Sequence, residues 1–198
     1  PNRVVITGDL IDKLAWLPQV CERLTTFAKQ IPDGVDFILG NHEYHHDVNK
    51  VLDALKRNTP MNILVNSNIQ IMGGKQPVYI AGVAYDNDRK KDNREAMINK
   101  ALSGIPDYAF VILLAHHPEF FEESIERKIP LTLSGHTHGG QIVFMGMPLV
   151  PTGTPYTKGR YVEEQSVCYV NNGTGHWFPI RINCPREITV ITFFDGVA

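Results

Sequence analysis

The feature that most constrains this fold is a pattern that occurs four times: a short apolar run is followed at once by a residue able to bind a metal ion. Short apolar runs bounded by turn residues are typical of buried strands. Ligands of open α/β sheets bind beyond the carboxyl ends of the strands. The pattern therefore predicts one pocket shared by the residues that follow the four runs: Asp9, Asn41, His116, His136 and His138.

Helical stretches separate most of the predicted strands, because apolar residues there recur at helical spacing. We expect helices over residues 17–29, 48–57, 92–103 and 119–128, and strands over residues 3–7, 36–39, 68–72, 78–83, 110–115 and 131–133. The strands near 68–72 and 78–83 look like a hairpin around Gly73 and Gly74. From Gln141 onward the sequence is β-rich and ends in a last apolar segment, 188–194. Together these features predict an α/β domain of packed sheets flanked by helices.

Length and composition fit one globular domain, since the chain has 198 residues of which 43% are hydrophobic. The formal net charge of −2 implies no strongly basic face, so nucleic acid is not an expected partner. No apolar run approaches the ~20 residues of a membrane span.

The three cysteines, Cys21, Cys168 and Cys184, are far apart and form no C-x-x-C pair. Such spacing is a poor basis for a zinc ribbon or a disulfide framework. We expect three partly buried thiols, and a Cys168–Cys184 bond stays compatible with the sequence.

Glycines next to the candidate ligands allow the chain to turn sharply and to bring side chains close together. Residues two apart in an extended segment point the same way, so we expect His136 and His138 to reach one site. A set of carboxylate, amide oxygen and imidazole ligands suits Mn²⁺, Fe or Zn²⁺. A carboxylate such as that of Asp9 can bridge two cations, and paired cations are a common device for attack at phosphorus.

Each of these residues also has an ordinary structural interpretation. Taken singly, Asp9 could cap a helix or turn, Asn41 could form an Asx turn, and His116 could be a hydrogen-bonded histidine at a strand end. Their joint occurrence after four strands favours a metal site. His45 and His46, by contrast, are expected at the rim or in solvent.

His117, His176 and Trp177 are expected to be structural or to line the pocket wall. The segment 145–160 is rich in glycine and proline and contains Tyr156 and Lys158. It could face the substrate or could simply connect two elements, and both alternatives stay open.

Four motifs resemble the successive blocks of the calcineurin-like metallophosphoesterase superfamily, in the order of that family. They are Gly8-Asp9-Leu10-Ile11-Asp12, Gly40-Asn41-His42-Glu43, Ala115-His116 and Gly135-His136-Thr137-His138. The run from Gly135 to Gln141, with Pro179-Ile180-Arg181 and Pro185-Arg186-Glu187-Ile188, is similar to the bacterial branch of YkuE-like and YaeI-like phosphodiesterases. That branch includes a UDP-2,3-diacylglucosamine pyrophosphatase. The resemblance implies a β-sandwich of two mixed sheets flanked by helices.

The resemblance also implies roles for these residues. Asp9 would bridge two divalent metal ions. Asn41, His116 and His136 would complete the second metal site, and His138 would bind the first metal. His42 would not bind metal but would protonate the leaving oxygen. Asp12 and Glu43 would orient neighbouring groups.

The sequence departs from the family pattern at its start, because Pro1 lies eight residues before Asp9 and no Asp-x-His block precedes it. In the family this block lies on a strand and gives the first metal two ligands. We therefore expect residues 1–198 to be a single phosphoesterase domain that lacks its first strand, with a gap in one sheet. The second metal site should be nearly intact and the first incomplete, so the fragment itself could be inactive.

As a hypothesis for the intact protein, a hydroxide held between two cations attacks phosphorus in line and His42 donates a proton to the departing oxygen. A phosphodiester or pyrophosphate is the expected substrate, as a small molecule or as a lipid-linked nucleotide-sugar precursor. Relatives often carry an N-terminal membrane segment, so membrane contact is compatible with the resemblance, and the full protein could be cytoplasmic or membrane-associated. The alternative function is a non-catalytic binding module on the same scaffold.

Overall fold

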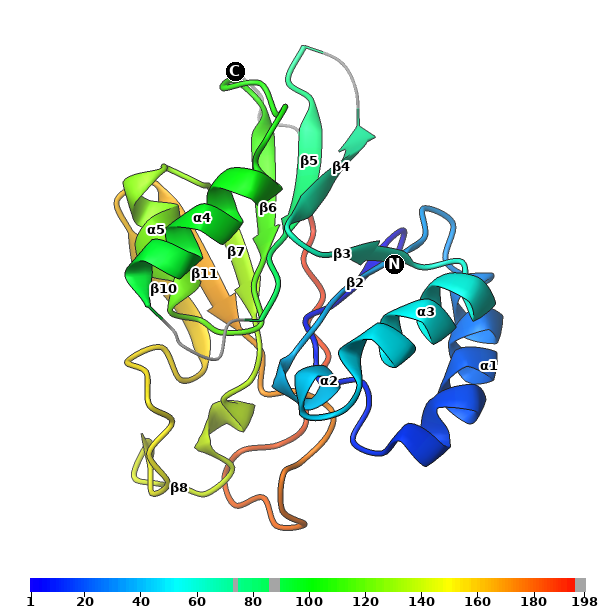
Figure 1. Cartoon of the computed structure of the whole chain (residues 1–198). Helices are drawn as coiled ribbons and strands as arrows, with labels where there is room; N and C mark the ends of the chain where they lie inside the picture. Colours follow the sequence, from blue (N-terminus) through cyan, green and yellow to red (C-terminus); the bar gives the residue numbers. More distant parts are fainter. Residues whose placement is uncertain (73–74, 86–89, 195–198) are drawn as a thin grey trace.

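The computed structural model describes residues 1–72, 75–85 and 90–194, and its framework is a pair of sheets packed face to face (Figure 1). The smaller sheet has the order β1-β2-β3, formed by Val4–Ile6, Val35–Ile38 and Asn62–Leu64. Both pairings in it are parallel. Strand β1 lies at an edge of this sheet as described, and whether an upstream strand pairs with that edge stays a prediction.

The larger sheet has six strands in the order β10-β11-β7-β6-β5-β4. Its four central strands run parallel, and an antiparallel strand closes each edge. The strands are β4 (Ser67–Met72), β5 (Val78–Gly82), β6 (Phe110–Leu114), β7 (Leu131–Ser134), β10 (Gly159–Glu163) and β11 (Ser166–Val170). A separate two-stranded ribbon consists of β8 (Val143–Phe144) and β9 (Met147–Pro148).

Helices cover the outer face of each sheet, so the molecule has four layers (Figure 1). The helices α1 (Leu17–Ala28) and α3 (Val48–Asn58) pack on the small sheet through Val51, Leu55 and their neighbours. On the large sheet lie α4 (Lys91–Ala101) and α5 (Phe120–Glu126). The short elements are η1 (Leu14–Trp16), α2 (Asn41–His45) and η2 (His138–Gly140). Between the sheets lies a core that includes Ile38, Leu64, Ile80, Ile112 and Leu114.

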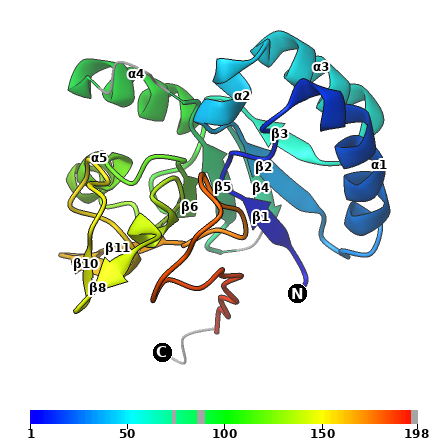
Figure 2. The same cartoon turned by 90° about the horizontal axis from the view of Figure 1, so that it is seen from below.

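This arrangement brings the carboxyl ends of β1, β2, β6 and β7 to one end of the sandwich, where α2 and η2 lie (Figure 1). Seen from that end, the loops of the two halves lie side by side (Figure 2). The parallel direction of these strands decides this outcome, because parallel strands deliver all their carboxyl ends to the same edge.

Most of the predicted elements are found within two residues of their expected bounds. The sequence did not predict β3 or α2, which are three and five residues long and too short to show a period. The expectation of β-structure does not hold for the last apolar segment, 188–194, which has no ladder partner among the described residues. Its side chains are largely exposed, with Ile188 at 82% and Phe194 at 86%. Gly73 and Gly74 lie outside the described residues.

The three cysteines are all free and buried, so the Cys168–Cys184 bond that the sequence allowed is not formed. Within residues 1–72, 75–85 and 90–194, no helix combines the length and the apolar character that a membrane crossing requires.

Gly82 shows how closely the two sheets approach, and it gives a test of the sandwich. A Cβ atom there would lie 2.5 Å from Leu64 Cβ and 2.6 Å from Ile38 Cγ2, both on the opposite sheet. We predict that Gly82→Ala lowers the free energy of unfolding by about 1–3 kcal/mol, as overpacking of a core does. Gly175→Ala is the matched control, because its added methyl meets no atom within 4 Å. Urea denaturation measures both, and equal stability of the two variants would contradict this packing.

Candidate metal centre

Four side chains from four different strand ends meet at one point. His116 Nε2 lies 3.2 Å from Asp9 Oδ2, 3.1 Å from Asn41 Oδ1 and 3.1 Å from His136 Nδ1. His136 Nδ1 is also 2.9 Å from Asn41 Oδ1. The structure thus brings together four of the five side chains predicted to be metal ligands. The first and the last, Asp9 and His136, are 127 positions apart in the sequence.

Two glycines allow the loops after β1 and β2 to touch. Gly8 has a φ of 98°, and a Cβ atom there would lie 2.6 Å from His116 Nδ1 and 2.7 Å from Gly40 Cα. A Cβ atom at Gly40 would clash with Asp9 Oδ1. Only glycine fits such close backbone approaches, so these two residues set the spacing of the ligands.

Glu43 fixes the two loops relative to each other. Its fully buried carboxylate accepts backbone N–H bonds from Asp9 at 3.0 Å, Leu10 at 2.7 Å, Ile11 at 2.9 Å and Gly40 at 2.7 Å. Burial raises the pKa of Glu43, and the negative charge of Asp9 adds to this, while the backbone hydrogen bonds oppose the rise. The predicted orienting role of Glu43 thus has a geometric basis.

Asp9 is held in a left-handed conformation, with a φ of 56°. This conformation is uncommon for a residue that is not glycine and is a form of local strain. The N–H bond from Asp9 to Glu43 maintains it, and the backbone N–H of His42 donates to Asp9 Oδ1 at 2.9 Å. Asp9 Oδ2 is thereby left to face His116.

His116 is 3% exposed, and its ring orientation is fixed by a backbone carbonyl. Its Nδ1 lies 2.6 Å from Thr7 O. Since a carbonyl oxygen only accepts, Nδ1 carries a hydrogen and Nε2 faces the cluster. Histidines that bind metals usually have this arrangement, in which the second ring nitrogen donates to a carbonyl or carboxylate.

Opposite charges dominate the electrostatics of this centre. Burial alone would raise the pKa of Asp9, but the hydrogen bond and charge of His116 hold it well below its ordinary value. Burial would lower the pKa of His116, but the hydrogen bond and charge of Asp9 raise it instead. Asp9 and His116 thus favour each other's charged forms.

The donor set fits a divalent cation. The contacts that join Asn41 Oδ1, Asp9 Oδ2 and the ring nitrogens of His116 and His136 are 2.9–3.2 Å long. Atoms at about 2.1 Å from one cation would be roughly 3.0 Å apart in octahedral and roughly 3.4 Å apart in tetrahedral coordination. Asn41 Oδ1 faces two imidazole nitrogens, and one cation could bind all three atoms at once.

His138 lines the same pocket but lies outside this four-atom group. The expectation that 136 and 138 belong to an extended segment is wrong: both residues are left-handed, with φ values of 67° and 50°. The chain turns as soon as β7 ends, and Thr137 N–H donates to Gly135 O at 2.8 Å. Both histidines nevertheless reach the pocket that contains Asp9 and Asn41.

Arg181 contacts His138, a contact that sequence analysis did not predict. Its Nη2 lies 3.2 Å from His138 Nδ1 and also donates to the carbonyls of Asn172 and Gly175 at 2.7 Å. Burial and then the charge of Arg181 lower the pKa of His138 to about 4, so this imidazole is neutral at pH 7. Arg181 stood out only as part of the motif 179–181, and its position 43 residues after His138 concealed the contact.

His42 and Asp12 form a pair at the mouth of the pocket. His42 Nδ1 is 3.0 Å from Asp12 Oδ1, and both side chains are partly exposed. A carboxylate in this position orients an imidazole and favours the tautomer with hydrogen on Nδ1. His46 Nε2 lies 2.8 Å from Asp12 O, which places His46 beside this pair, as its predicted rim position requires.

His117 forms the wall behind His136. Their ring centroids are 4.0 Å apart, and His117 also contacts Tyr85 edge to face at 5.1 Å. His116, His117 and His136 each offer a ligand atom within 4.8 Å of the others, so His117 is closer to the centre than the sequence indicated. His176 lies near Arg186, with 3.5 Å between Nδ1 and Nη2.

The pocket above these ligands has a volume of about 270 Å³. Val150, Pro151 and Thr152 line it, so this part of segment 145–160 faces the pocket, and its contact with a substrate stays a prediction. Tyr156 instead packs between Phe121 and Tyr161. Trp177 completes the rim, as its predicted place in the pocket wall requires.

The family model for calcineurin-like phosphoesterases matches residues 1–140 of this chain. A metallophosphoesterase of Campylobacter jejuni without an assigned function is 36% identical over 199 residues, covering 96% of this chain and 50% of the relative. YkuE of Bacillus subtilis, a metallophosphoesterase, is 32% identical, covering 97% of this chain and 68% of YkuE. A zebrafish transmembrane protein with a metallophosphoesterase domain is 32% identical, covering 96% of this chain and 45% of its own length.

The chain thus spans about half the length of the Campylobacter relative and two thirds of YkuE. The matched region contains Asp9, Asn41, His116, His136 and His138, the residues that form the pocket described above. The family depends on divalent metal ions, which agrees with the donor set at the strand ends. By its sequence and its fold, the chain belongs to the calcineurin-like phosphoesterase family.

Proposed function

We propose that the full-length protein hydrolyses phosphodiester or pyrophosphate bonds with two divalent cations, Mn²⁺, Fe or Zn²⁺, in the pocket at the strand ends of this chain. The observation that carries the proposal is the meeting of Asp9 Oδ2, Asn41 Oδ1, His116 Nε2 and His136 Nδ1 within 3.2 Å contacts. Membership of a metal-dependent phosphoesterase family supports it.

Asp9, Asn41, His116 and His136 would hold one cation. Asp9 would also reach the other cation, the first metal of the family, together with His138, which lines the same pocket. The family resemblance assigns that first metal two more ligands on an upstream Asp-x-His block. The presence of that block and the activity of the whole protein are both parts of the proposal.

Bound cations would supply positive charge that lowers the pKa of water and draws electrons from phosphorus. The protein side chains have separate tasks. Asp9 stays ionised because its pKa is low, so its ligand oxygen is available at neutral pH. The amide of Asn41 directs Oδ1 to the ligand cluster, and its NH₂ group is then free to donate to a phosphoryl oxygen in the pocket.

His42 is positioned to act on the leaving group. Its Nδ1 is engaged with Asp12, and its ring lines the pocket. The second ring nitrogen can therefore carry a proton to the departing oxygen. Asp12 keeps the ring in this orientation.

The size of the pocket favours a small phosphoester over a lipid-linked precursor. Acyl chains would need an apolar groove beside the metal centre. The larger cavity of about 680 Å³ lies between η1, α1 and α3, and it shares no lining residue with the pocket of about 270 Å³. A small molecule is therefore the substrate form that we propose.

His116 provides a test of metal binding. His116→Ala should weaken binding of Mn²⁺ by on the order of 100-fold or more, because it removes the central ligand. His117→Ala is the matched control, since it removes the adjacent imidazole but leaves the four-atom group in place; we expect a loss of less than about tenfold. Equilibrium dialysis with elemental analysis measures both. A larger loss in His117→Ala would mean that the ligand is His117.

His42 provides a test of turnover. His42→Ala should keep the metal content and lower the rate of hydrolysis by about 10²–10⁴-fold, the usual contribution of a general acid. The loss should be larger for a dinucleotide than for bis(p-nitrophenyl) phosphate, because nitrophenolate leaves without a proton. Asp12→Asn should show a smaller loss with the same substrate dependence. A His42→Ala chain that binds less metal would refute the proposed proton-donor role.

Hydrolysis by the metal-loaded protein also separates the catalytic proposal from the alternative of a binding module. Cation binding without turnover of either substrate by the full-length protein would favour the binding module; residues 1–198 alone do not decide it, because their first metal site is expected to be incomplete.

A further inference from the structure

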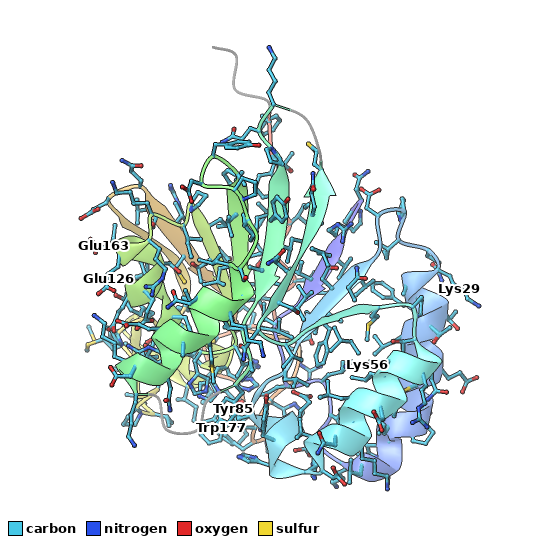
Figure 3. All side chains as sticks on the ribbon, turned by 45° about the horizontal axis from the view of Figure 1, so that its top comes forward. Lys29, Lys56, Tyr85, Glu126, Glu163 and Trp177 are labelled. Carbon is cyan, nitrogen blue, oxygen red and sulfur yellow. The ribbon has the colours of Figure 1, made fainter. Side chains whose placement is uncertain are left out.

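Trp177 is the one aromatic side chain among the residues that line the pocket, apart from its histidines. It comes from the segment between β11 and the end of the described chain, far in sequence from the ligands. Figure 3 labels it at the same end of the molecule as the carboxyl ends of the strands. It is 49% exposed. Burying a side chain of this size would stabilise the fold by several kcal/mol, so its exposure at a pocket calls for an explanation.

The backbone at Trp177 is held firmly even though the side chain is open. Gln141 is fully buried, and its Oε1 accepts the Trp177 N–H at 2.8 Å. Its Nε2 donates to the carbonyls of Phe178 and Ile180, each at 2.9 Å. Gln141 follows directly after the loop that contains His136 and His138. Gln141, next to the loop that contributes the histidines, thus fixes the backbone that carries the indole. Less conformational entropy is then lost when a ligand binds.

The indole also has support on one side. The ring of Phe178 contacts it edge to face, with centroids 4.6 Å apart. Val150 and Pro151 add apolar surface to the lining of the pocket. The other side chains that line the pocket are polar: those of Asp9, Asn41, His42, His136, Thr137, His138 and Thr152. The pocket therefore combines a polar, charged floor with an apolar and aromatic rim.

The dimensions indicate what such a rim would contact. A volume of about 270 Å³ holds a phosphoryl group with space beside it, and Trp177 lines the same pocket, so the rest of a ligand whose phosphoryl group is bound here can reach the indole. A half-exposed indole offers a flat π-surface, and planar heterocycles stack on such surfaces whatever their exact hydrogen-bonding pattern. An alkyl chain would gain no comparable advantage from a flat face.

We propose that Trp177 stacks on the planar base of a nucleoside phosphate whose phosphoryl group occupies the pocket. This inference rests on the proposed function, in that the phosphate is bound by the metal-loaded ligand cluster. It adds a substrate class, esters of nucleosides, and a specificity-determining residue at the rim.

Two ligands that differ only in the base test the proposal. Adenosine 5′-monophosphate and ribose 5-phosphate have the same sugar and phosphate. The Mn²⁺-loaded chain should bind the nucleotide about 5- to 150-fold more tightly, the range that corresponds to stacking of one base. Trp177→Ala should remove this difference by weakening nucleotide binding, and should leave ribose 5-phosphate binding unchanged. Trp177→Phe should retain part of the preference.

Fluorescence reports on the contact directly, because the chain has two tryptophans. Trp16 lies on η1, with Lys13 Nζ 5.1 Å from its ring, and is not part of the pocket. In a Trp16→Phe background, the nucleotide should quench the remaining emission and ribose 5-phosphate should not. In a Trp177→Phe background, neither ligand should change the emission of Trp16.

Equal affinity for the two ligands, an equal loss of both in Trp177→Ala, or no binding of either would overturn the proposal. These outcomes are separate from those of the hydrolase proposal. Base-dependent quenching without hydrolysis by the full-length protein would support stacking and refute catalysis. Hydrolysis without any preference for the base would support catalysis and refute stacking.

Discussion

The metal centre depends above all on one buried carboxylate. Glu43 accepts four backbone N–H bonds, three from the loop after β1 and one from the loop after β2. Hydrogen bonds to a charged acceptor contribute about 1.5–3 kcal/mol each, and a buried carboxylate without them would be very costly. This clamp keeps Asp9 in its left-handed conformation and places Asn41 beside it. Without it, the two loops would lose three of the hydrogen bonds that join them, and the oxygen ligands would be held less firmly.

The sandwich supplies the other half of the centre. His116 and His136 follow β6 and β7 of the large sheet, whereas Asp9 and Asn41 follow β1 and β2 of the small one. The ligands therefore meet only because the two sheets pack face to face with their carboxyl ends aligned. The 2.6 Å contact from His116 Nδ1 to Thr7 O joins the two sheets at that point. Packing of the core and geometry of the site are thus parts of one arrangement.

The sequence predicted the strands, the main helices and the convergence of Asp9, Asn41, His116 and His136, because each signal is local. An apolar run, a glycine and a ligand lie within a few residues of one another. Contacts that span the chain left no local signal. Arg181 beside His138 and Gln141 beneath Trp177 are of this kind, as is the stacking of His117 on His136.

The errors have physical causes as well. The pair 136 and 138 reaches one pocket through left-handed turns and not through an extended segment, because the strand ends at Ser134. The segment 188–194 has the composition of a strand, but the described residues give its backbone no partner. A strand is defined by its neighbours, which a single-sequence pattern does not include. The roles of the candidate ligands as metal ligands stay predictions.

The most direct test of the account is the position of a cation. Crystals grown with Mn²⁺ and measured for anomalous scattering would locate it independently of any assumption about ligands. The account predicts an anomalous peak in contact with Asp9 Oδ2, Asn41 Oδ1, His116 Nε2 and His136 Nδ1. A peak bound by His117, or peaks only at surface carboxylates with these four atoms unliganded, would contradict it.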